Sequence, residues 1–501
     1  MIEPLICEFH TTNGNLYVYD TFTNYTYPVD DIDLFIIKNY KKLSLNEIKN
    51  ILASKYLEDD IAKSYCKVKQ WVKHDKAFFP AWSSGLFNNL NLPTQTEFNR
   101  LLSNIKMLTL EITQKCNLRC KYCVFSGNFK YWRQHTNLNM NWKIAKQSID
   151  YFLKLIHSYT RLTTFKGGLT FFGGEPLLNF PLIEKCALYF KAQLKNEEPI
   201  FGITTNGTLL NRQIIKFLVK NNFQLTISLD GPPSEHDKKR VFSNGKGSFG
   251  RVIKNLDLLY KFDKNYCEKN ISFNIVYTPS TNLKKVVLFF SDLMNKYNFT
   301  PIINFAFVNT YNIKENIFDN NNQESKNILI DLKTQYFDFK KADKKMNSYY
   351  YCLDKLFGGD HPSFYYRSCM NDKEDLGRFL GGQCYPGCTK IYVQSDGSFL
   401  ICEKVNGKFV IGNCEQGVIY EKVIEILTKF SRKILNECDK CFCNRVCLVC
   451  AASVATDNDF DKNGICDIVR ENFKKFLIDH YSIMEKNPNA WKREMLGNNH
   501  F

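Results

Sequence analysis

The sequence lacks the features that mark secreted, membrane-spanning and nucleic-acid-binding proteins. No N-terminal stretch combines a basic start, an apolar centre and a small-residue cleavage site, so no signal peptide is expected. No apolar run approaches the length that spans a bilayer. The net charge is +16, but Lys and Arg are scattered among Asp and Glu without a basic stripe. We therefore expect a cytoplasmic protein with no nucleic acid and no membrane as partner.

Internal repeats and low-complexity tracts are also missing, whereas cysteine is abundant. The 501-residue chain is long enough for about two to four domains and contains 19 cysteines. Thiols stay reduced in the cytosol, so these residues are expected to be metal ligands or buried apolar side chains before disulfides.

Residues 1–82 are expected to form a small winged-helix-like module. "NLYVYD" (15–20) and "TYPVDDI" (26–32) alternate as short strands, and "SLNEIKNILASKYL" has Ser44 as a helix N-cap with Glu47 three residues on. An exposed strand edge in such a module can accept an extended peptide as an added strand. A plain structural cap is the alternative. The Ser-, Asn- and Pro-containing stretch that follows predicts a linker over 83–104.

Residues 105–320 alternate between strand-like and helical patterns about six times. This alternation predicts an α/β fold with a parallel sheet and helices outside, as in a full or partial barrel. Active sites of such sheets form at the C-terminal ends of the strands. The predicted strands are "LTLEIT", "GLTFFGGEP", "FGITTNG", "LTISLDG", "ISFNIVYT" and "IINFAFV".

Three cysteines follow the first of these strands. "EITQKCNLRCKYC" places Cys116, Cys120 and Cys123 in a C-x3-C-x2-C array. Three thiolates on one loop can bind three corners of a cubane iron–sulfur cluster and leave the fourth iron open, whereas four close a structural metal site. On spacing alone, a zinc site or buried thiols remain alternatives.

Motifs at the next strand ends favour the cluster. "GGEP" (173–176), "TTNGTLL" (204–210) and "SLDG" (228–231) each follow a predicted strand, and Tyr122 precedes the third cysteine. This ordered set resembles the radical S-adenosylmethionine (SAM) superfamily. The resemblance implies a partial (β/α)6 TIM-like barrel, a [4Fe-4S] cluster on the three cysteines, and a 5′-deoxyadenosyl radical that abstracts hydrogen from substrate.

The resemblance also assigns contacts with SAM. Glu175 would pair with the ammonium group, and Ser228 and Asp230 match the ribose-binding position. Glycines allow close backbone approach. Each polar residue could instead cap a helix. The expected cofactor-binding residues are Tyr122, Gly173, Gly174, Glu175, Asn206, Ser228 and Asp230.

A second cysteine-rich region spans 384–480, after a polar, aromatic bridging region (321–383) and before a tail (481–501). Its cysteine order resembles the SPASM extension, which binds two auxiliary [4Fe-4S] clusters in peptide-modifying radical SAM enzymes. The resemblance implies one cluster on Cys384, Cys402 and Cys450, with Cys388 as a possible fourth ligand. It implies another on Cys438, Cys441, Cys447 and Cys466. A zinc ribbon is the alternative, and Cys443 fits neither set.

The order of docking module, barrel and auxiliary-cluster extension resembles maturases of ribosomally synthesised peptides. It implies a Cys-rich precursor peptide whose leader binds the N-terminal module, Cys-sulfur-to-carbon thioether crosslinks, and an external flavodoxin- or ferredoxin-like electron donor. Glu403 lies where relatives carry an acidic base; a surface salt bridge is the alternative. Other readings are carbon–carbon crosslinking, epimerisation, anaerobic sulfatase-type Cys/Ser oxidation, and a non-enzymatic peptide-binding Fe–S scaffold.

Overall fold

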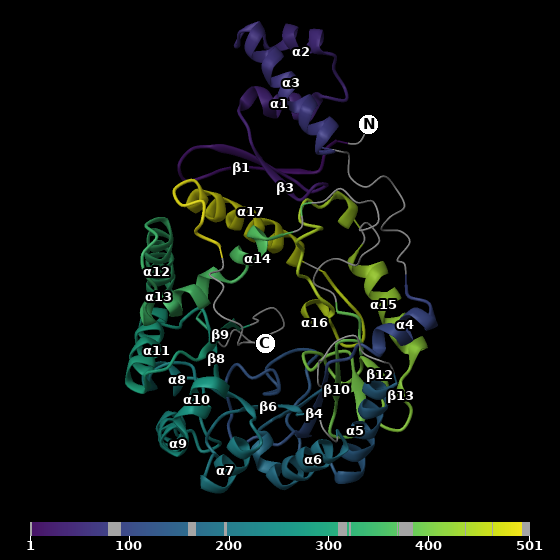
Figure 1. Ribbon diagram of the computed structural model, residues 1–501, viewed down its shortest axis with the longest axis vertical. Helices are drawn as coiled ribbons and strands as arrows, with labels where there is room; N and C mark the ends of the chain where they lie inside the picture. The colour runs from purple at the N-terminus through teal and green to yellow at the C-terminus, as the bar shows by residue number, and fades with distance from the viewer. Residues whose placement is uncertain are drawn as a thin grey trace.

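The structure is a computed structural model in which a small N-terminal module stands at one end of the molecule and the central sheet with its helices at the other (Figure 1). No helix in the described part of the chain is long and apolar enough to cross a membrane. The described residues are 3–78, 92–158, 167–194, 198–308, 318–319, 322–367, 369, 384–435, 437–462 and 464–492.

The N-terminal module is a three-stranded antiparallel sheet with three helices. The two predicted strands pair through a turn, and Ser44 and Glu47 form the expected capping box. The sequence pattern did not reveal β1, which pairs with the other side of β2. The elements are β1 (Ile6–His10), β2 (Leu16–Asp20), β3 (Tyr25–Pro28), α1 (Asp31–Asn39), α2 (Leu45–Leu52) and α3 (Glu58–His74).

The two faces of this sheet bury different surfaces. One face packs on the module's own helices around Val18, Ile36 and Val68. The other face, with Phe9 and Tyr19, packs against the C-terminal helix α17 (Ile465–Met484), which crosses directly beneath the module in Figure 1. The module is therefore joined to the C-terminal region by an apolar contact.

Six parallel strands form the centre of the larger sheet, and all six predicted strands are present. They pair in chain order, as successive strand–helix units require. The strands are β4 (Met107–Thr113), β5 (Gly168–Gly173), β6 (Ile200–Thr205), β7 (Gln224–Ser228), β8 (Ile271–Tyr277) and β9 (Ile302–Phe307).

Side chains alternate between the two faces of these strands. On β4, Leu108, Leu110 and Ile112 belong to the apolar core beneath the helices, whereas Thr109 and Glu111 point the other way. Hydrogen bonds between neighbouring strands mark this second, polar face. They join Thr109 with Thr170 (2.7 Å), Thr226 with Ser272 (2.8 Å) and Asn304 with Asn274 (3.2 Å).

The helices that cover the apolar face begin at predictable residues. Asn141 and Asn211 cap α5 and α7 with their side chains, which defines where both helices begin. The helices of this part are α4 (Gln95–Leu102), α5 (Trp142–His157), η1 (Pro176–Asn179), α6 (Phe180–Gln193), α7 (Arg212–Lys220), α8 (Pro233–His236), α9 (Phe249–Phe262), α10 (Lys264–Asn270) and α11 (Leu283–Tyr297).

The C-terminal region continues the barrel sheet. β10 runs parallel to β4, with Lys390 opposite Met107, and then turns into a hairpin at Gly397, whose φ is +94°. The remaining strands are antiparallel. The elements are β10 (Lys390–Val393), β11 (Ser398–Leu400), β12 (Val410–Asn413), β13 (Gly417–Val418), α15 (Tyr420–Ile434), η4 (Cys438–Lys440) and α16 (Ala451–Val454).

Three expected boundaries differ in the structure. Residues 83–91 of the predicted linker lie outside the described residues, but α4 follows within it and buries Phe98 in the barrel core. The bridging region is largely helical up to residue 367; 368 and 370–383 lie outside the described part. The predicted tail contains the buried Trp491, and only 493–501 lie beyond description. The bridging helices are α12 (Gln323–Lys341), α13 (Ser348–Leu353), η2 (Asp354–Gly358) and α14 (His361–Tyr365).

Candidate active site

The first cysteine loop leaves the end of β4 and is held by the glycine pair after β5. The amide of Gly174 donates to the carbonyl of Thr113 (2.9 Å), and the amide of Glu175 donates to that of Lys115 (2.8 Å). A Cβ on Gly173 would lie 2.1 Å from the Thr113 oxygen, and one on Gly174 would lie 2.1 Å from the Lys115 oxygen. The glycines are thus needed where the two loops meet, so they position the cysteines directly.

The three predicted cluster cysteines lie together on this loop. The amide of Cys123 donates to the carbonyl of Cys120 (3.0 Å), and the amide of Leu118 faces the sulfur of Cys116 (3.4 Å). Burial raises the pKa of Cys116 to about 12 and that of Cys123 to about 11. Without a metal the thiols hold their protons; a bound metal ion would displace them. Three partly buried thiols on one loop fit a cluster with an open iron.

Glu175 lies at the centre of the strand-end contacts. Its buried carboxylate accepts hydrogen bonds from the Thr205 hydroxyl (2.7 Å) and from the amides of Leu177 (3.1 Å) and Asn206 (2.7 Å). Burial raises its pKa, and a cationic ligand group would offset that penalty. The Asn206 side chain reaches Asn117 on the cysteine loop (2.9 Å). Both residues thus tie β5 and β6 to that loop.

Asp230 and Tyr122 contact each other directly. The hydroxyl of Tyr122 donates to Asp230 Oδ2 (2.6 Å), which also accepts from Arg240 Nε (3.1 Å), while Oδ1 accepts from the amide of Val276 (3.0 Å). Asp230 therefore holds the side chains of Tyr122 and Arg240 at the end of the fourth strand. Ser228, at the end of β7, stays partly exposed on the polar face of the sheet.

A basic segment beyond the fourth strand was missed by the sequence analysis. Arg240 is buried, and its Nη1 lies 3.9 Å from the sulfur of Cys120. Lys239 Nζ donates to the Val276 carbonyl and to the Thr281 hydroxyl, both at 3.1 Å. The run "HDKKR" (236–240), placed directly after a strand-end motif, was the available indication. Arg240 thus places positive charge beside the Cys120 thiol, whereas Lys239 ties this segment to the end of the next strand.

Four C-terminal cysteines act on one another electrostatically. Burial, reinforced by the neighbouring thiols of Cys441, Cys447 and Cys466, raises the pKa of Cys438 to about 12. Burial also raises the pKa of Cys447, with Cys441 and Cys466 adding to the effect. These four thiols, which the sequence assigns to one auxiliary cluster, are therefore neighbours that are partly shielded from water.

Cys443 has a position that the sequence did not suggest. It is buried, and its hydrogen bond with Cys441 lowers the pKa of the Cys441 thiol to about 6 while raising its own. Cys7 on β1 also acts on Cys443 electrostatically. The thiol that neither predicted set includes thus lies between a candidate ligand and the N-terminal sheet.

The other predicted cluster set is less uniform. Cys384 is exposed, Cys402 is partly buried just after β11, and Cys450 is the N-cap of α16. Cys388 belongs to the apolar core, where its sulfur faces the carbonyl of Pro386 (3.8 Å) and burial raises its pKa to about 12. Cys388, the possible fourth ligand, thus contacts the apolar core.

Glu403 forms an ion pair instead of a poised base. Its Oε2 accepts from Lys390 Nζ (2.6 Å) and from the thiol of Cys402 (3.2 Å). Although burial opposes it, the Lys390 ammonium and these hydrogen bonds lower the pKa of Glu403. A carboxylate with a lowered pKa is a weak base, so the salt bridge that the sequence left open as the alternative is what the geometry favours.

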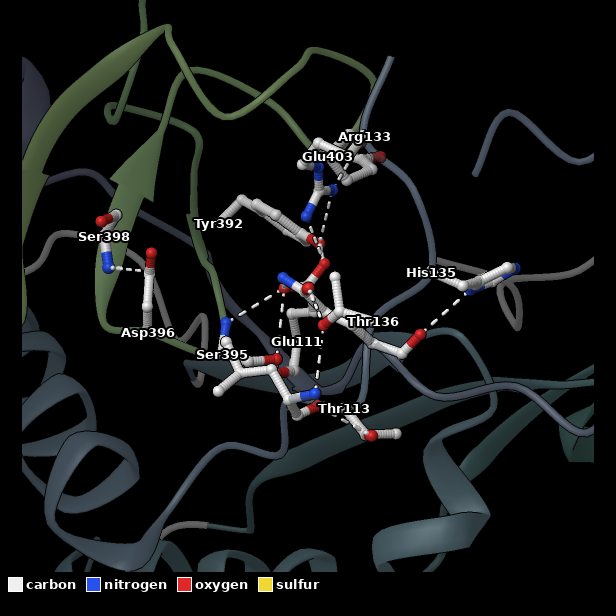
Figure 2. Close-up of polar contacts among 12 residues, drawn as sticks. Glu111, Thr113, Arg133, His135, Thr136, Tyr392, Ser395, Asp396, Ser398 and Glu403 are labelled. Carbon is white, nitrogen blue, oxygen red and sulfur yellow. Dashed lines mark hydrogen bonds and ion pairs between the residues drawn. The ribbon is translucent and has the colours of Figure 1, made fainter. Parts of the chain in front are cut away.

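A buried polar network links the barrel to the C-terminal hairpin (Figure 2). Glu111 on β4 forms an ion pair with Arg133, and it accepts hydrogen bonds from the Tyr392 hydroxyl (2.8 Å) and the Ser395 amide (3.0 Å). Its side chain is 3% exposed and that of Arg133 is 10% exposed. A buried carboxylate with this many donors is fully compensated, so the network pins β4 to β10.

In the described ranges, no three His, Cys, Asp or Glu side chains converge closely enough to hold one metal ion.

Comparisons with known proteins agree with this geometry. Residues 110–293 match the radical SAM superfamily. The chain is 27% identical over 409 residues to the radical SAM cyclopropyl synthase TigE of Paramaledivibacter caminithermalis, covering 76% of this chain and 75% of that protein. It is 26% identical over 386 residues to a cysteine-type anaerobic sulfatase-maturating enzyme of Clostridium perfringens, covering 74% of this chain and 95% of that enzyme.

A solved structure shows the same fold. Native anSMEcpe with bound AdoMet and Cp18Cys peptide aligns with a TM-score of 0.55 at 21% identity, over 77% of this chain and 99% of that one. The chain thus contains a radical SAM domain over residues 110–293, and the relatives that it resembles are named as radical SAM and peptide-maturing enzymes. Proteins with this domain use SAM and a [4Fe-4S] cluster, the two cofactors that the first cysteine loop and its neighbouring motifs were expected to hold.

Proposed function

We propose that this enzyme modifies a ribosomally synthesised Cys-rich precursor peptide and forms thioether links between cysteine sulfur and carbon. One observation carries the proposal. The N-terminal module, with a strand edge suited to a peptide, is fixed to the loop that bears the C-terminal cysteines. The following contacts support the two parts of that observation.

β3 is the proposed docking edge for the leader peptide. Within the described residues, β3 pairs with β2 alone, and Tyr25 is 43% exposed. Tyr27 packs against Trp71 of α3 with ring centroids 4.8 Å apart. A leader added to β3 would gain backbone hydrogen bonds and reach these aromatic rings. Helix α3 exposes four lysines, which favour an acidic leader peptide: Lys63, Lys67, Lys69 and Lys73.

The module holds the loop between Cys441 and Cys447. The hydroxyl of Thr21 donates to the carbonyl of Phe442 (2.9 Å), and Arg445 donates to the carbonyl of Phe22. Thr21 and Phe22 form the turn that leads into β3. A leader bound at β3 would therefore sit one turn away from the proposed second auxiliary cluster.

The polar face of the barrel sheet suits a peptide substrate. Its Thr, Ser and Asn side chains offer donors and acceptors to a peptide backbone, whereas an apolar substrate would leave them unpaired. We assign the cluster that binds SAM to Cys116, Cys120 and Cys123. Glu175, Ser228 and Asn206 are the proposed SAM contacts.

The proposed auxiliary clusters lie on Cys384, Cys402 and Cys450 and on Cys438, Cys441, Cys447 and Cys466. When bound, SAM and the reduced cluster supply the 5′-deoxyadenosyl radical. The substrate carbon loses one hydrogen atom to it, giving 5′-deoxyadenosine, and the cysteine thiol loses its proton to a base. The carbon–sulfur bond then forms, and the remaining electron passes to an oxidised auxiliary cluster. An external flavodoxin- or ferredoxin-like donor provides the electron for SAM cleavage.

An anaerobic assay tests the proposal with reductant, SAM and a small Cys-rich peptide. The expected product has lost two hydrogen atoms per link, and tandem fragmentation should place the new bond on sulfur. A matched peptide with serine in place of cysteine should consume SAM without forming the link. An unchanged peptide mass with no 5′-deoxyadenosine would contradict the proposal.

The same assay separates the alternative chemistries on this scaffold. A carbon–carbon link gives the same mass loss but appears in the serine peptide as well. Epimerisation leaves the mass unchanged and, in deuterated water, adds one deuterium at the inverted carbon. A non-enzymatic Fe–S scaffold would give no 5′-deoxyadenosine with any peptide.

Sulfatase-type Cys/Ser oxidation is the second candidate, because the matched C. perfringens relative bears that name and is covered almost completely. About a quarter of this chain lies outside that match, however, since the alignment covers 74% of it. A sulfatase-derived peptide should therefore be a poor substrate. Its conversion to an aldehyde, seen as a hydrazine adduct, would favour the second candidate.

A further inference from the structure

The loop that follows Cys123 carries two side chains that reach different parts of the molecule. Arg133 extends toward the C-terminal hairpin, whereas His135, two residues later, extends back toward the cysteine loop (Figure 2). Nε2 of His135 lies 3.6 Å from the sulfur of Cys123, and its Nδ1 lies 3.0 Å from the carbonyl of Gln114. One short segment thus touches both cysteine-bearing regions.

Arg133 holds three partners in the C-terminal direction. Its guanidinium forms the ion pair with Glu111 and donates from Nη2 to the Tyr392 hydroxyl (3.1 Å) and the carbonyl of Glu403 (3.5 Å). The guanidinium also lies over the ring of Phe125 at 4.9 Å and over that of Tyr392 at 5.5 Å. The planar guanidinium lies against two aromatic rings and can rotate little, so these contacts hold the Arg133 side chain in one orientation.

The contact with Glu403 leads to a proposed cluster ligand. Glu403 directly follows Cys402, and the Cys402 thiol donates to its carboxylate (3.2 Å). On the other side, Gln114 Nε2 donates to Glu111 Oε2 (3.0 Å) and the Gln114 carbonyl faces His135. Contacts between protein groups therefore continue from Cys123 through Gln114, Glu111 and Arg133 to Cys402.

We propose that Arg133 is a positioning residue that holds the Cys402 segment at a fixed separation from the first cysteine loop. In this view it sets the environment of both proposed clusters, although it touches neither SAM nor substrate. The inference rests on the proposed function for the cluster at Cys402. It concerns a joint just beyond the sheet, since β11 ends at Leu400, two residues before Cys402, and the Arg133 contact falls on Glu403.

The test compares anaerobically reconstituted wild-type enzyme with Arg133→Gln, Arg133→Lys and Arg251→Gln. Gln keeps a polar side chain but loses the positive charge and the planar guanidinium. Lys keeps a positive charge for Glu111 but also lacks the guanidinium. Arg251, exposed on α9, is the matched control for removing a surface arginine. Hydrogen–deuterium exchange and electron paramagnetic resonance are measured on each protein.

Arg133→Gln should raise amide exchange by about tenfold or more in both 107–123 and 390–403, because the segments lose their common partner. It should also change the resonance signals of both clusters and increase the 5′-deoxyadenosine formed per modified peptide. Arg133→Lys should restore part of each effect. Arg251→Gln should match wild type in amide exchange, in the resonance signals and in the 5′-deoxyadenosine formed per modified peptide.

The inference is overturned if exchange rises in one segment alone, or if both resonance signals and the product ratio stay at wild-type values. A wild-type enzyme with only about four irons per chain would instead refute the auxiliary clusters of the proposed function. In that event the exchange measurement alone decides whether Arg133 joins the segments.

Discussion

Thr21 of the N-terminal sheet donates a hydrogen bond to the carbonyl of Phe442, which lies between Cys441 and Cys447. With the Arg445 contact to Phe22, it joins the proposed leader-docking module to a cysteine-bearing loop. One contact ends on a backbone carbonyl of the cysteine-bearing loop and the other on a backbone carbonyl of the turn before β3. The two contacts therefore hold the turn and the loop in a fixed relative position.

Loosening this joint should separate leader binding from modification. In Thr21→Val with Arg445→Gln, the β3 edge stays intact, so leader affinity by fluorescence anisotropy should change less than about threefold. Peptide modification by mass spectrometry should fall about tenfold or more, while SAM cleavage without peptide continues. Equal loss of leader affinity and of turnover would contradict this expectation.

Replacing Glu175 should weaken SAM binding. Glu175→Gln removes the buried negative charge proposed to face the SAM ammonium, and hydrogen bonds to charged groups contribute about 1.5–3 kcal/mol. We therefore expect a ten- to hundredfold rise in the Kd for SAM, measured by equilibrium dialysis under anaerobic conditions. Thr205→Val is the control, because it removes one hydrogen bond to Glu175 but keeps the charge. An unchanged Kd in Glu175→Gln would exclude the proposed contact.

A methyl group at Gly174 should prevent the cysteine loop from seating. Its Cβ would lie 2.1 Å from the carbonyl oxygen of Lys115, which is too close for any contact. Gly174→Ala should therefore lose about four irons per chain after reconstitution and abolish SAM cleavage. Gly250→Ala is the matched control, because nothing lies within 4 Å of its Cβ and the site is helical. Normal iron content in Gly174→Ala would show that the loops can separate without cost.

Cys388 and Cys402 should behave differently when changed to alanine. Cys388→Ala should keep the full iron content and lose about 1 kcal/mol of stability, since it removes one small buried group. Cys402→Ala should lose the iron of one cluster. Iron and sulfide analysis with guanidinium unfolding distinguishes the two results. Loss of iron in Cys388→Ala would restore it as a ligand.

Acid should destabilise the protein through two buried histidines. His361 and His480 face each other with Nδ1 atoms 3.0 Å apart, and burial lowers their pKa values to about 3 and about 2. An unfolded histidine titrates near about 6.5, so below that pH the unfolded chain binds more protons. Their stabilising contribution is complete above pH ~6.5 and falls by about 1.4 kcal/mol per pH unit for each ring as pH decreases.

The variant His480→Phe keeps the aromatic stack and removes one of these titrations. The wild-type free energy of unfolding should therefore approach that of the variant by about 1.4 kcal/mol per pH unit between roughly pH 6 and 4. Guanidinium unfolding at several pH values measures the difference. A difference that does not change with pH would mean that His480 titrates normally in the folded protein.

The sequence predicted what depends on local pattern and repeat. Alternating apolar residues revealed the six barrel strands, and the meeting of Gly174 with the cysteine loop follows from motifs at adjacent strand ends. Arg133, Arg240 and Cys443 could not be found in this way. Their roles come from partners far away in the chain, and no periodicity records which buried carboxylate or thiol an arginine or cysteine will meet.

The same distinction explains why α4 was not expected. Phe98 looked like part of a polar linker because its neighbours are Ser, Asn and Gln, yet it is buried against the barrel. Packing there overrode a compositional indication.

The parallel pairing of β4 with β10 has a consequence for synthesis of the chain. β4 leaves the ribosome early, but one of its two neighbours is translated only near the end. Until Lys390–Val393 emerges, a nascent chain presents a bare strand edge, which is a site for aggregation or chaperone binding. Shortened expression clones that end before β10 should therefore accumulate in inclusion bodies, even though they contain every residue of the six-stranded barrel.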